Sequence, residues 1–331
     1  MDEIDAVREL GADVPVASAV ARDEARQRLL VLARAADRSR SRYDGARLPR
    51  LRRVLAAVVT LFVFVFGVAV WPVPFAAPSL GPEAAAAAAL NAAADVAAAQ
   101  PRGSQGRYRY TKSRGVFMAT TTLGGGRHFS YLSPVAREIW IAPDGSGRIR
   151  ETRGEPVFLS EEDRAQWQAA GSPRDEGTNG DFGRGALAYE NLDALPTNPA
   201  LLRLVILARA LETQVRVDAE MFVIVGDLLR ETVARPELTS ALYRVAASLD
   251  RIELLGETKD RAGRSGIAVA MTSDYAGAKT RRVLVFDPRS GRLLAEEEVL
   301  LEPYRTYRGP HPPVVIGHST YLESKIVDRL P

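Results

Sequence analysis

An uninterrupted apolar run from Val54 to Trp71 constrains this chain more than any other feature of its sequence. Its 18 residues, VLAAVVTLFVFVFGVAVW, include no charged side chain and no proline. As a helix that rises about 1.5 Å per residue, the run is about 27 Å long, close to the thickness of the hydrocarbon core of a bilayer. A buried helix of a soluble protein normally keeps a polar face. The run therefore predicts a transmembrane helix within residues 51–75.

The charges on the two sides of this run predict its orientation. Residues 26–53 carry ten arginines and two aspartates, whereas residues 54–101 carry no lysine or arginine. Cytoplasmic flanks of membrane spans are enriched in Lys and Arg, so the N-terminus is expected in the cytoplasm and the C-terminal part outside. We expect an uncleaved signal-anchor in the cell membrane. Cleavage near the small residues of 75–77 is the alternative, although signal peptides have a shorter basic region and a shorter apolar core.

Composition and motif spacing argue against several classes of function. The net charge of +3 is too small to indicate nucleic-acid binding, and the absence of cysteine excludes disulfides and thiol chemistry. His128, His311 and His318 have no partner at a metal-ligand spacing, and no Gly-x-Ser-x-Gly motif occurs. The three glutamates of residues 296–298 alternate between the faces of a strand, which we interpret as a solvated edge. We expect a protein that is not an enzyme and uses no metal or cofactor.

Residues 1–50 are predicted to form a cytoplasmic helical segment. A helix over residues 18–36 places Val20, Leu29 and Leu32 on one apolar stripe. Such short helices bury too little surface to be stable alone. The segment is therefore either a loosely folded tail or a region that folds on a cytoplasmic partner, in which case these three residues make the contact.

Beyond the apolar run we expect two parts. Residues 76–105 are predicted to form a Pro/Ala-rich linker and a helix, because alanine is the best helix former, and this helix is expected to lie against the first strands. Residues 106–331 are predicted to form an exterior α+β domain, because strands are followed by helices and then by strands again. Its fold is expected to be a curved antiparallel sheet covered by helices.

Local signals place the elements of the exterior domain. Asp144-Gly145 predicts a hairpin between strands at 137–141 and 148–152, and Ser160 and Asn198 predict helix N-caps. The segment 171–185 is polar and Gly-rich, so it is expected to be a surface loop. Five further strands are predicted at residues 252–257, 266–272, 280–286, 293–301 and 314–322.

The helices predicted within residues 199–249 carry more apolar positions than one helix face requires. We expect them to cover the sheet, with any ligand between the two layers. A closed core is one interpretation, and a cleft that admits an acyl chain is the other. The candidate ligand-binding residues are Met221, Phe222, Ile224, Leu228 and Leu242.

Several segments resemble a family of actinobacterial single-pass membrane proteins. They are MDEIDAVRELGADVP at 1–15, EIWIAPDGSG at 138–147, ETRGEP at 151–156, LPTNP at 195–199, GDLLRET at 226–232, ALYR at 241–244, FDPRSG at 286–291 and YL at 321–322. Genes of this family often neighbour extracytoplasmic-function sigma factors, so the resemblance implies an anti-sigma-like role with a sigma factor as the partner. Residues 1–53 depart from zinc anti-sigma domains, because they contain no His and no Cys.

The exterior part is also similar in layout to the lipoprotein-carrier half-barrel of LolA and RseB. There an Ala-rich helix precedes the first strand, and helices line the concave face of a curved antiparallel sheet. This similarity implies a lipid or lipoprotein ligand by analogy of fold. Two functions follow: membrane-bound signalling, in which residues 1–45 engage a cytoplasmic partner, or a membrane-anchored lipid- or lipoprotein-binding module with a passive tail.

Overall fold

The computed structural model describes residues 81–331, except for 104–105, 124–126, 175, 185, 187–191, 214, 232–234 and 276–277. The described residues belong to one compact unit, Ala76–Pro331. The predicted cytoplasmic segment, the predicted transmembrane helix and the contact residues Val20, Leu29 and Leu32 lie outside the described residues. Among the helices of the described part, none is long and apolar enough to cross a membrane.

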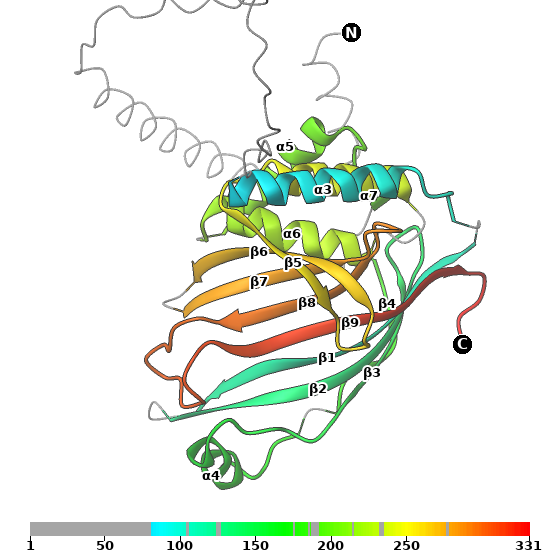
Figure 1. The fold of residues 1–331 in the computed structure, drawn as a ribbon. Helices are drawn as coiled ribbons and strands as arrows, with labels where there is room; N and C mark the ends of the chain where they lie inside the picture. Colours follow the sequence, from blue (N-terminus) through cyan, green and yellow to red (C-terminus); the bar gives the residue numbers. More distant parts are fainter. Residues whose placement is uncertain are drawn as a thin grey trace, which may run out of the picture. The chain divides into compact units, whose positions relative to one another are not determined.

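The described residues form nine strands in one antiparallel sheet, with the order β4-β3-β2-β1-β9-β8-β7-β6-β5 (Figure 1). The last strand of the chain, β9, lies between β1 and β8, so it joins the first strands to those that follow the helices. The strands are β1 Tyr108–Thr122, β2 His128–Ile141, β3 Gly147–Arg153, β4 Asn179–Phe182, β5 Ile252–Lys259, β6 Ser265–Tyr275, β7 Ala278–Phe286, β8 Leu293–Leu300 and β9 Val314–Val327.

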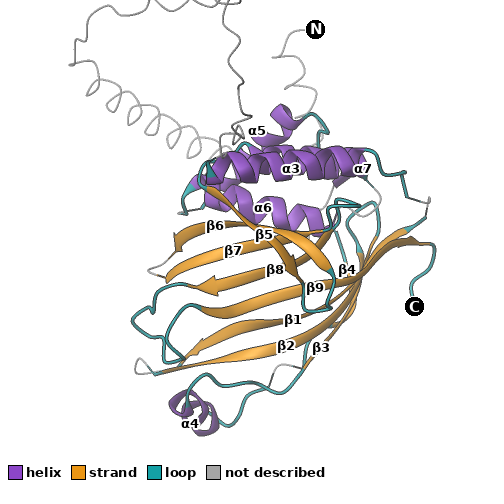
Figure 2. Ribbon diagram, in the orientation of Figure 1, coloured by secondary structure: helices purple, strands orange, loops and turns teal. Residues whose placement is uncertain are grey.

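Four of the described helices are stacked against the β5–β8 part of the sheet (Figure 2). Helix α6 contacts the strands directly, α3 packs against α7 and β5, and α5 packs against α6 and α7. Helix α4 lies apart from them and contacts β2. The prediction of an antiparallel sheet covered by helices is confirmed. The described helices are α3 Pro82–Ala98, α4 Glu161–Ala169, α5 Pro199–Ala210, α6 Val217–Glu231 and α7 Pro236–Ala247.

Local capping signals explain where several elements begin. The Ser160 hydroxyl accepts a hydrogen bond from the Asp163 amide (3.1 Å) and starts α4. The Asn198 side chain accepts from the first amides of α5, with Pro199 at the first helical position. Gly145 adopts a φ of +82° in the hairpin turn between β2 and β3. These helix starts and this hairpin confirm the predictions from sequence.

Three details differ from the predictions. Helix α3 packs on α7 and β5 instead of the first strands, because its small buried face fits closely against another helix. The predicted surface loop 171–185 contains β4, whose sequence Asn-Gly-Asp-Phe lacks the apolar alternation that predicts a strand. Strand β2 begins at His128, well before the predicted start at residue 137, because it pairs with β1 from Arg109 to Thr122.

The strand β5, at one edge of the sheet, is interrupted by a bulge. Its register with β6 shifts between Leu254 and Gly256, and Gly256 has a φ of +88°. Glycine adopts this backbone conformation without the steric cost that a side chain imposes. The bulge therefore bends β5, which crosses in front of its neighbours in Figure 1.

The turn between β5 and β6 reaches across the sheet to β8 and β9. Asp260 is buried and accepts hydrogen bonds from the amides of Ala262 and Arg264 and from Arg264 Nε (2.7 Å). Arg264 Nη2 then donates to the backbone carbonyls of Leu294 (3.1 Å) and Tyr321 (2.8 Å). Arg264 therefore connects the β5–β6 hairpin to β8 and β9, which stabilises the curvature of the sheet.

The turn between β7 and β8 generates a first testable prediction. Gly291 has a φ of +67°, and a Cβ atom there would lie 2.8 Å from the Ala97 Cβ and 3.0 Å from the Ala93 carbonyl oxygen on α3. Gly291→Ala combines backbone strain with overpacking, so we expect a loss of about 2–5 kcal/mol in the free energy of unfolding. Urea denaturation of the fragment 81–331 measures it.

Gly263→Ala is the matched control for this prediction. Gly263 also has a positive φ (+81°), but nothing lies within 4 Å of an added Cβ. Only the cost of the left-handed conformation remains, about 1–2 kcal/mol. Equal losses for the two variants would contradict the close approach between this turn and α3.

Candidate functional site

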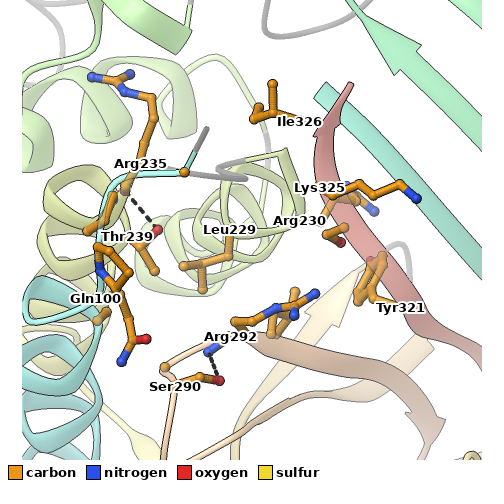
Figure 3. Close-up of a pocket in the computed structure, with 17 residues that line it drawn as sticks. Gln100, Leu229, Arg230, Arg235, Thr239, Ser290, Arg292, Tyr321, Lys325 and Ile326 are labelled. Atoms are coloured by element: carbon orange, nitrogen blue, oxygen red, sulfur yellow. Dashed lines mark hydrogen bonds between the residues drawn. The ribbon is translucent and has the colours of Figure 1, made fainter. Parts of the chain in front are cut away.

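A pocket of about 350 Å³ lies where the helices meet β8 and β9 (Figure 3). Its walls come from the end of α3, the junction of α6 with α7, the turn before β8, and β9. Its volume falls within the range of small-ligand sites, about 300–1,000 Å³. The apolar part of the lining consists of Ala97, Pro101, Leu229, Pro236, Leu293 and Ile326.

Four cationic residues line the same pocket, and no Asp or Glu is among its described lining residues. Three of the four are engaged with groups outside the lining: Arg230 pairs with Asp227 and lies near Glu296. Lys325 pairs with Glu323 at 2.6 Å, and Arg235 donates a hydrogen bond to the Leu192 carbonyl. The fourth cation is Arg292.

Arg292 is the cation best placed to meet a ligand. It follows Gly291 in the turn before β8, its side chain is exposed, and it forms no ion pair with a described residue. Figure 3 shows the side chain extending from the turn toward Tyr321. A guanidinium in such a place binds a carboxylate or phosphate through charge-assisted hydrogen bonds.

Tyr321 and Arg230 connect the pocket to a buried ionic cluster. The Tyr321 hydroxyl, on a side chain 4% exposed, donates to Glu296 Oε1 at 2.5 Å. Arg282 Nη2 donates to Glu296 Oε2 at 3.2 Å, and Arg230 Nη1 lies 3.8 Å from Oε1. Arg230 also pairs with Asp227 one turn earlier on α6. The cluster thus joins β7, β8 and β9 to α6.

The position of Glu296 corrects the prediction of a solvated edge at residues 296–298. Glu296 is only 5% exposed, because β8 is an internal strand between β7 and β9. A buried carboxylate requires charged or hydrogen-bonding partners, and Glu296 has three. Glu297 and Glu298 are half-buried and pair with Arg261 and Arg282 at 3.2 and 3.8 Å.

Helix α6 carries three carboxyl groups whose pKa values are raised. Burial is the main cause for Glu220, Asp227 and Glu231. The negative charge of Asp227 adds to the rise in the pKa of Glu220, whereas Arg282 opposes it. Burial also raises the pKa of Tyr321, so its hydroxyl keeps the proton that it donates to Glu296.

The five candidate ligand-binding residues are gathered in the core between the helices and the sheet. Met221, Phe222, Ile224, Leu228 and Leu242 are each between 0% and 4% exposed. None of them lines the pocket beside β9. An acyl chain would reach them only if the two layers parted, so their role in binding remains a prediction.

The histidines have no common site in the described residues. His128 and His311 hydrogen-bond to the backbone carbonyls of Thr306 (3.1 Å) and Pro312 (2.7 Å). Burial lowers the pKa of His318. Within the described part of the chain, no group of three or more His, Asp or Glu side chains is arranged to hold a metal ion. The expectation of no metal and no cofactor remains a prediction.

The fold and the pocket define the folded unit as an α+β protein with an open, curved antiparallel sheet and an amphipathic pocket at the end of its helices. No family model and no curated protein matches the chain. Among solved structures, the crystal structure of MucB in complex with MucA(peri) is similar to it, with 13% identity and a TM-score of 0.23. The match covers 72% of this chain and 55% of that one, so the chain spans little more than half of the MucB chain.

This distant similarity concerns the arrangement of the fold, and at such a TM-score it assigns neither a partner nor an activity. The resemblance to an actinobacterial membrane-protein family finds no support in these comparisons. The function therefore has to be argued from the pocket and its residues.

The raised pKa of Glu220 generates a prediction about pH. A carboxyl group whose folded pKa lies above its ordinary value of 4.5 stabilises the fold below that value, and the benefit is lost as pH rises through the folded pKa. Glu220→Gln removes the ionised form, so the variant should melt at a higher temperature than the wild type at pH 7. The difference should vanish near pH 4, where Glu220 is protonated.

Thermal melts of both proteins at the two pH values measure this difference. The exposed Glu257, on β5, provides the matched control as Glu257→Gln. A lower melting temperature for Glu220→Gln at pH 7 would show that ionised Glu220 stabilises the fold, contrary to its raised pKa.

Proposed function

We propose that the folded unit binds an anionic amphiphile, a lipid or the lipidated end of a lipoprotein, and that the chain is a non-enzymatic protein anchored in the cell membrane. The observation that carries the proposal is the composition of the pocket: apolar walls, an exposed arginine at the rim, and no acidic residue among its described lining residues. Small-ligand sites combine a mainly apolar lining with a few placed polar groups in this way.

The two ends of such a ligand fit different parts of the pocket. The phosphate or carboxylate would meet Arg292, which has no competing ion pair among the described residues. The hydrocarbon part would lie against Leu229, Leu293 and Ile326. Tyr321 supports the site indirectly, since its hydroxyl is committed to Glu296.

Reversal of the charge at the rim tests this proposal. Arg292→Glu should weaken binding of a short-chain phosphatidylglycerol by at least about tenfold, or about 1.4 kcal/mol, because attraction at the headgroup becomes repulsion. Isothermal titration of the fragment 81–331 below the micellar concentration of the lipid measures the affinity. Binding of a short-chain phosphatidylcholine should change less.

Arg289→Glu is the matched control. Arg289 is exposed in the same turn, carries the same charge and does not line the pocket. The proposal requires that this variant binds as the wild type does. Equal weakening by both variants would show that the loss of affinity comes from the change in net charge and not from a contact with Arg292. If the wild type does not bind the lipid, an amphiphile pocket is excluded.

We further propose that the chain signals across the membrane: the folded unit lies outside, and residues 1–50 engage a cytoplasmic partner. Support comes from the sequence, through the arginines before the apolar run and the stripe of Val20, Leu29 and Leu32. The resemblance to proteins encoded beside sigma factors suggests a sigma factor as the partner. A passive tail is the alternative.

Capture experiments with the full-length chain separate these two functions. Leu29→Asp with Leu32→Asp removes two apolar anchors, each of which contributes about 1.5–3 kcal/mol when buried. The variant should lose the cytoplasmic partner while membrane insertion is unchanged. Protease added to spheroplasts should degrade the chain beyond about residue 100 and spare the first 50 residues, as a cytoplasmic N-terminus requires. If the unmodified chain captures no cytoplasmic partner, the anchored binding module remains as the function.

A further inference from the structure

Helix α5 and its C-cap residue, Leu211, present an apolar stripe to the outside of the folded unit. Leu201, Leu204 and Leu211 are 39%, 57% and 42% exposed, and their spacing of three and seven residues places them on one face. The opposite face of the helix is used for folding, because Leu202 and Ile206 are fully buried in the core.

Seven large apolar side chains of the described residues are exposed, and three of them lie in this stripe. The other four are Phe117, Val157, Leu255 and Leu322, and each lies on a different segment. Single exposed apolar residues are normal on protein surfaces, whereas a contiguous set marks an interaction site. The stripe on α5 is therefore an interaction surface.

The position of α5 leaves this surface accessible. The helix packs on α6 and α7, and Figure 2 shows it on the side of α3 and α7 that is turned away from the sheet. Helix α3, where the described part of the chain begins, packs on the same α7. The stripe and the start of the folded unit thus belong to one layer of helices.

The length of the preceding chain indicates what this layer faces. Eleven residue steps separate Trp71, at the end of the apolar run, from Pro82, at the start of α3, and they span at most about 40 Å. If the run spans the membrane, as the proposed function holds, the start of α3 stays within that distance of the bilayer.

The charge of α5 matches an anionic membrane surface. The helix carries Arg203 and Arg209 and contains no Asp or Glu, and one exposed acidic residue, Glu212, follows Leu211. Interfacial helices combine an apolar face with basic residues in this manner. We propose that α5 docks on the outer surface of the bilayer, with Leu201, Leu204 and Leu211 at the boundary of headgroups and acyl chains. This inference rests on the membrane anchor of the proposed function and adds a second contact with the lipid.

A single thiol makes the proposal testable in the full-length chain. The natural sequence has no cysteine, so Leu204→Cys introduces one labelling site. The labelled chain is reconstituted in vesicles of phosphatidylcholine and phosphatidylglycerol, with and without brominated acyl chains. The fluorescence of a label at position 204 should be quenched by the brominated lipids.

Leu255→Cys is the matched control, because Leu255 is 45% exposed on β5 and lies outside the stripe. Its label should stay unquenched. Adding Leu201→Glu and Leu211→Glu to Leu204→Cys should abolish quenching, whereas Leu322→Glu, at an exposed leucine on β9, should not.

Extraction with carbonate, run in parallel, separates failure of docking from failure of the anchor. Retention in the membrane without quenching at 204 would leave the anchor intact and overturn docking. Release from the membrane by carbonate, together with quenching at position 204, would support docking and contradict the transmembrane anchor. Release without quenching would contradict both. Disulfide formation between the thiols introduced at position 204 of two chains, without quenching, would show that a second copy of the chain covers this face and would also overturn docking.

Discussion

The buried carboxylate of Glu296 is the interaction on which the arrangement of helix and sheet depends. Its partners come from three other elements: Tyr321 from β9, Arg282 from β7 and Arg230 from α6. Since a buried charge is unfavourable unless its partners are all in place, the cluster favours one relative position of α6 and the sheet. Gly226 permits the close approach, because a Cβ there would lie 3.0 Å from Leu284 and 3.5 Å from Glu296 Oε2. Two members of the cluster, Arg230 and Tyr321, also line the pocket.

Much of the fold could be predicted from the sequence, because its signals are local. Ser160 and Asn198 cap helices through atoms two or three residues away, and Asp144-Gly145 forms a hairpin turn by itself. The order of strands and helices then restricts the fold to an antiparallel sheet with a helical layer. Strand β4 was missed because its four residues carry no apolar alternation and are held by pairing with β3.

The candidate site, in contrast, has no local signal. Its rim residue Arg292 is one of many arginines, and its walls combine Pro101, Leu229 and Ile326, which lie more than 200 residues apart at the extremes. The run of glutamates at 296–298 was visible, but its burial depends on β9, the last strand of the chain, which inserts between β1 and β8. The partners that bury the Glu296 side chain, Arg230 on α6 and Tyr321 on β9, are brought to it by the tertiary structure, so no short pattern reveals its burial.

The bulge in β5 has a consequence for how the protein meets other chains. An outer strand with free backbone groups invites another strand to pair with it, which leads to aggregation between copies. Here the bend at Gly256 breaks the regular ladder, and α3 packs beside β5. The opposite border, β4, has only four residues. Both borders of the sheet therefore discourage backbone pairing with a foreign strand.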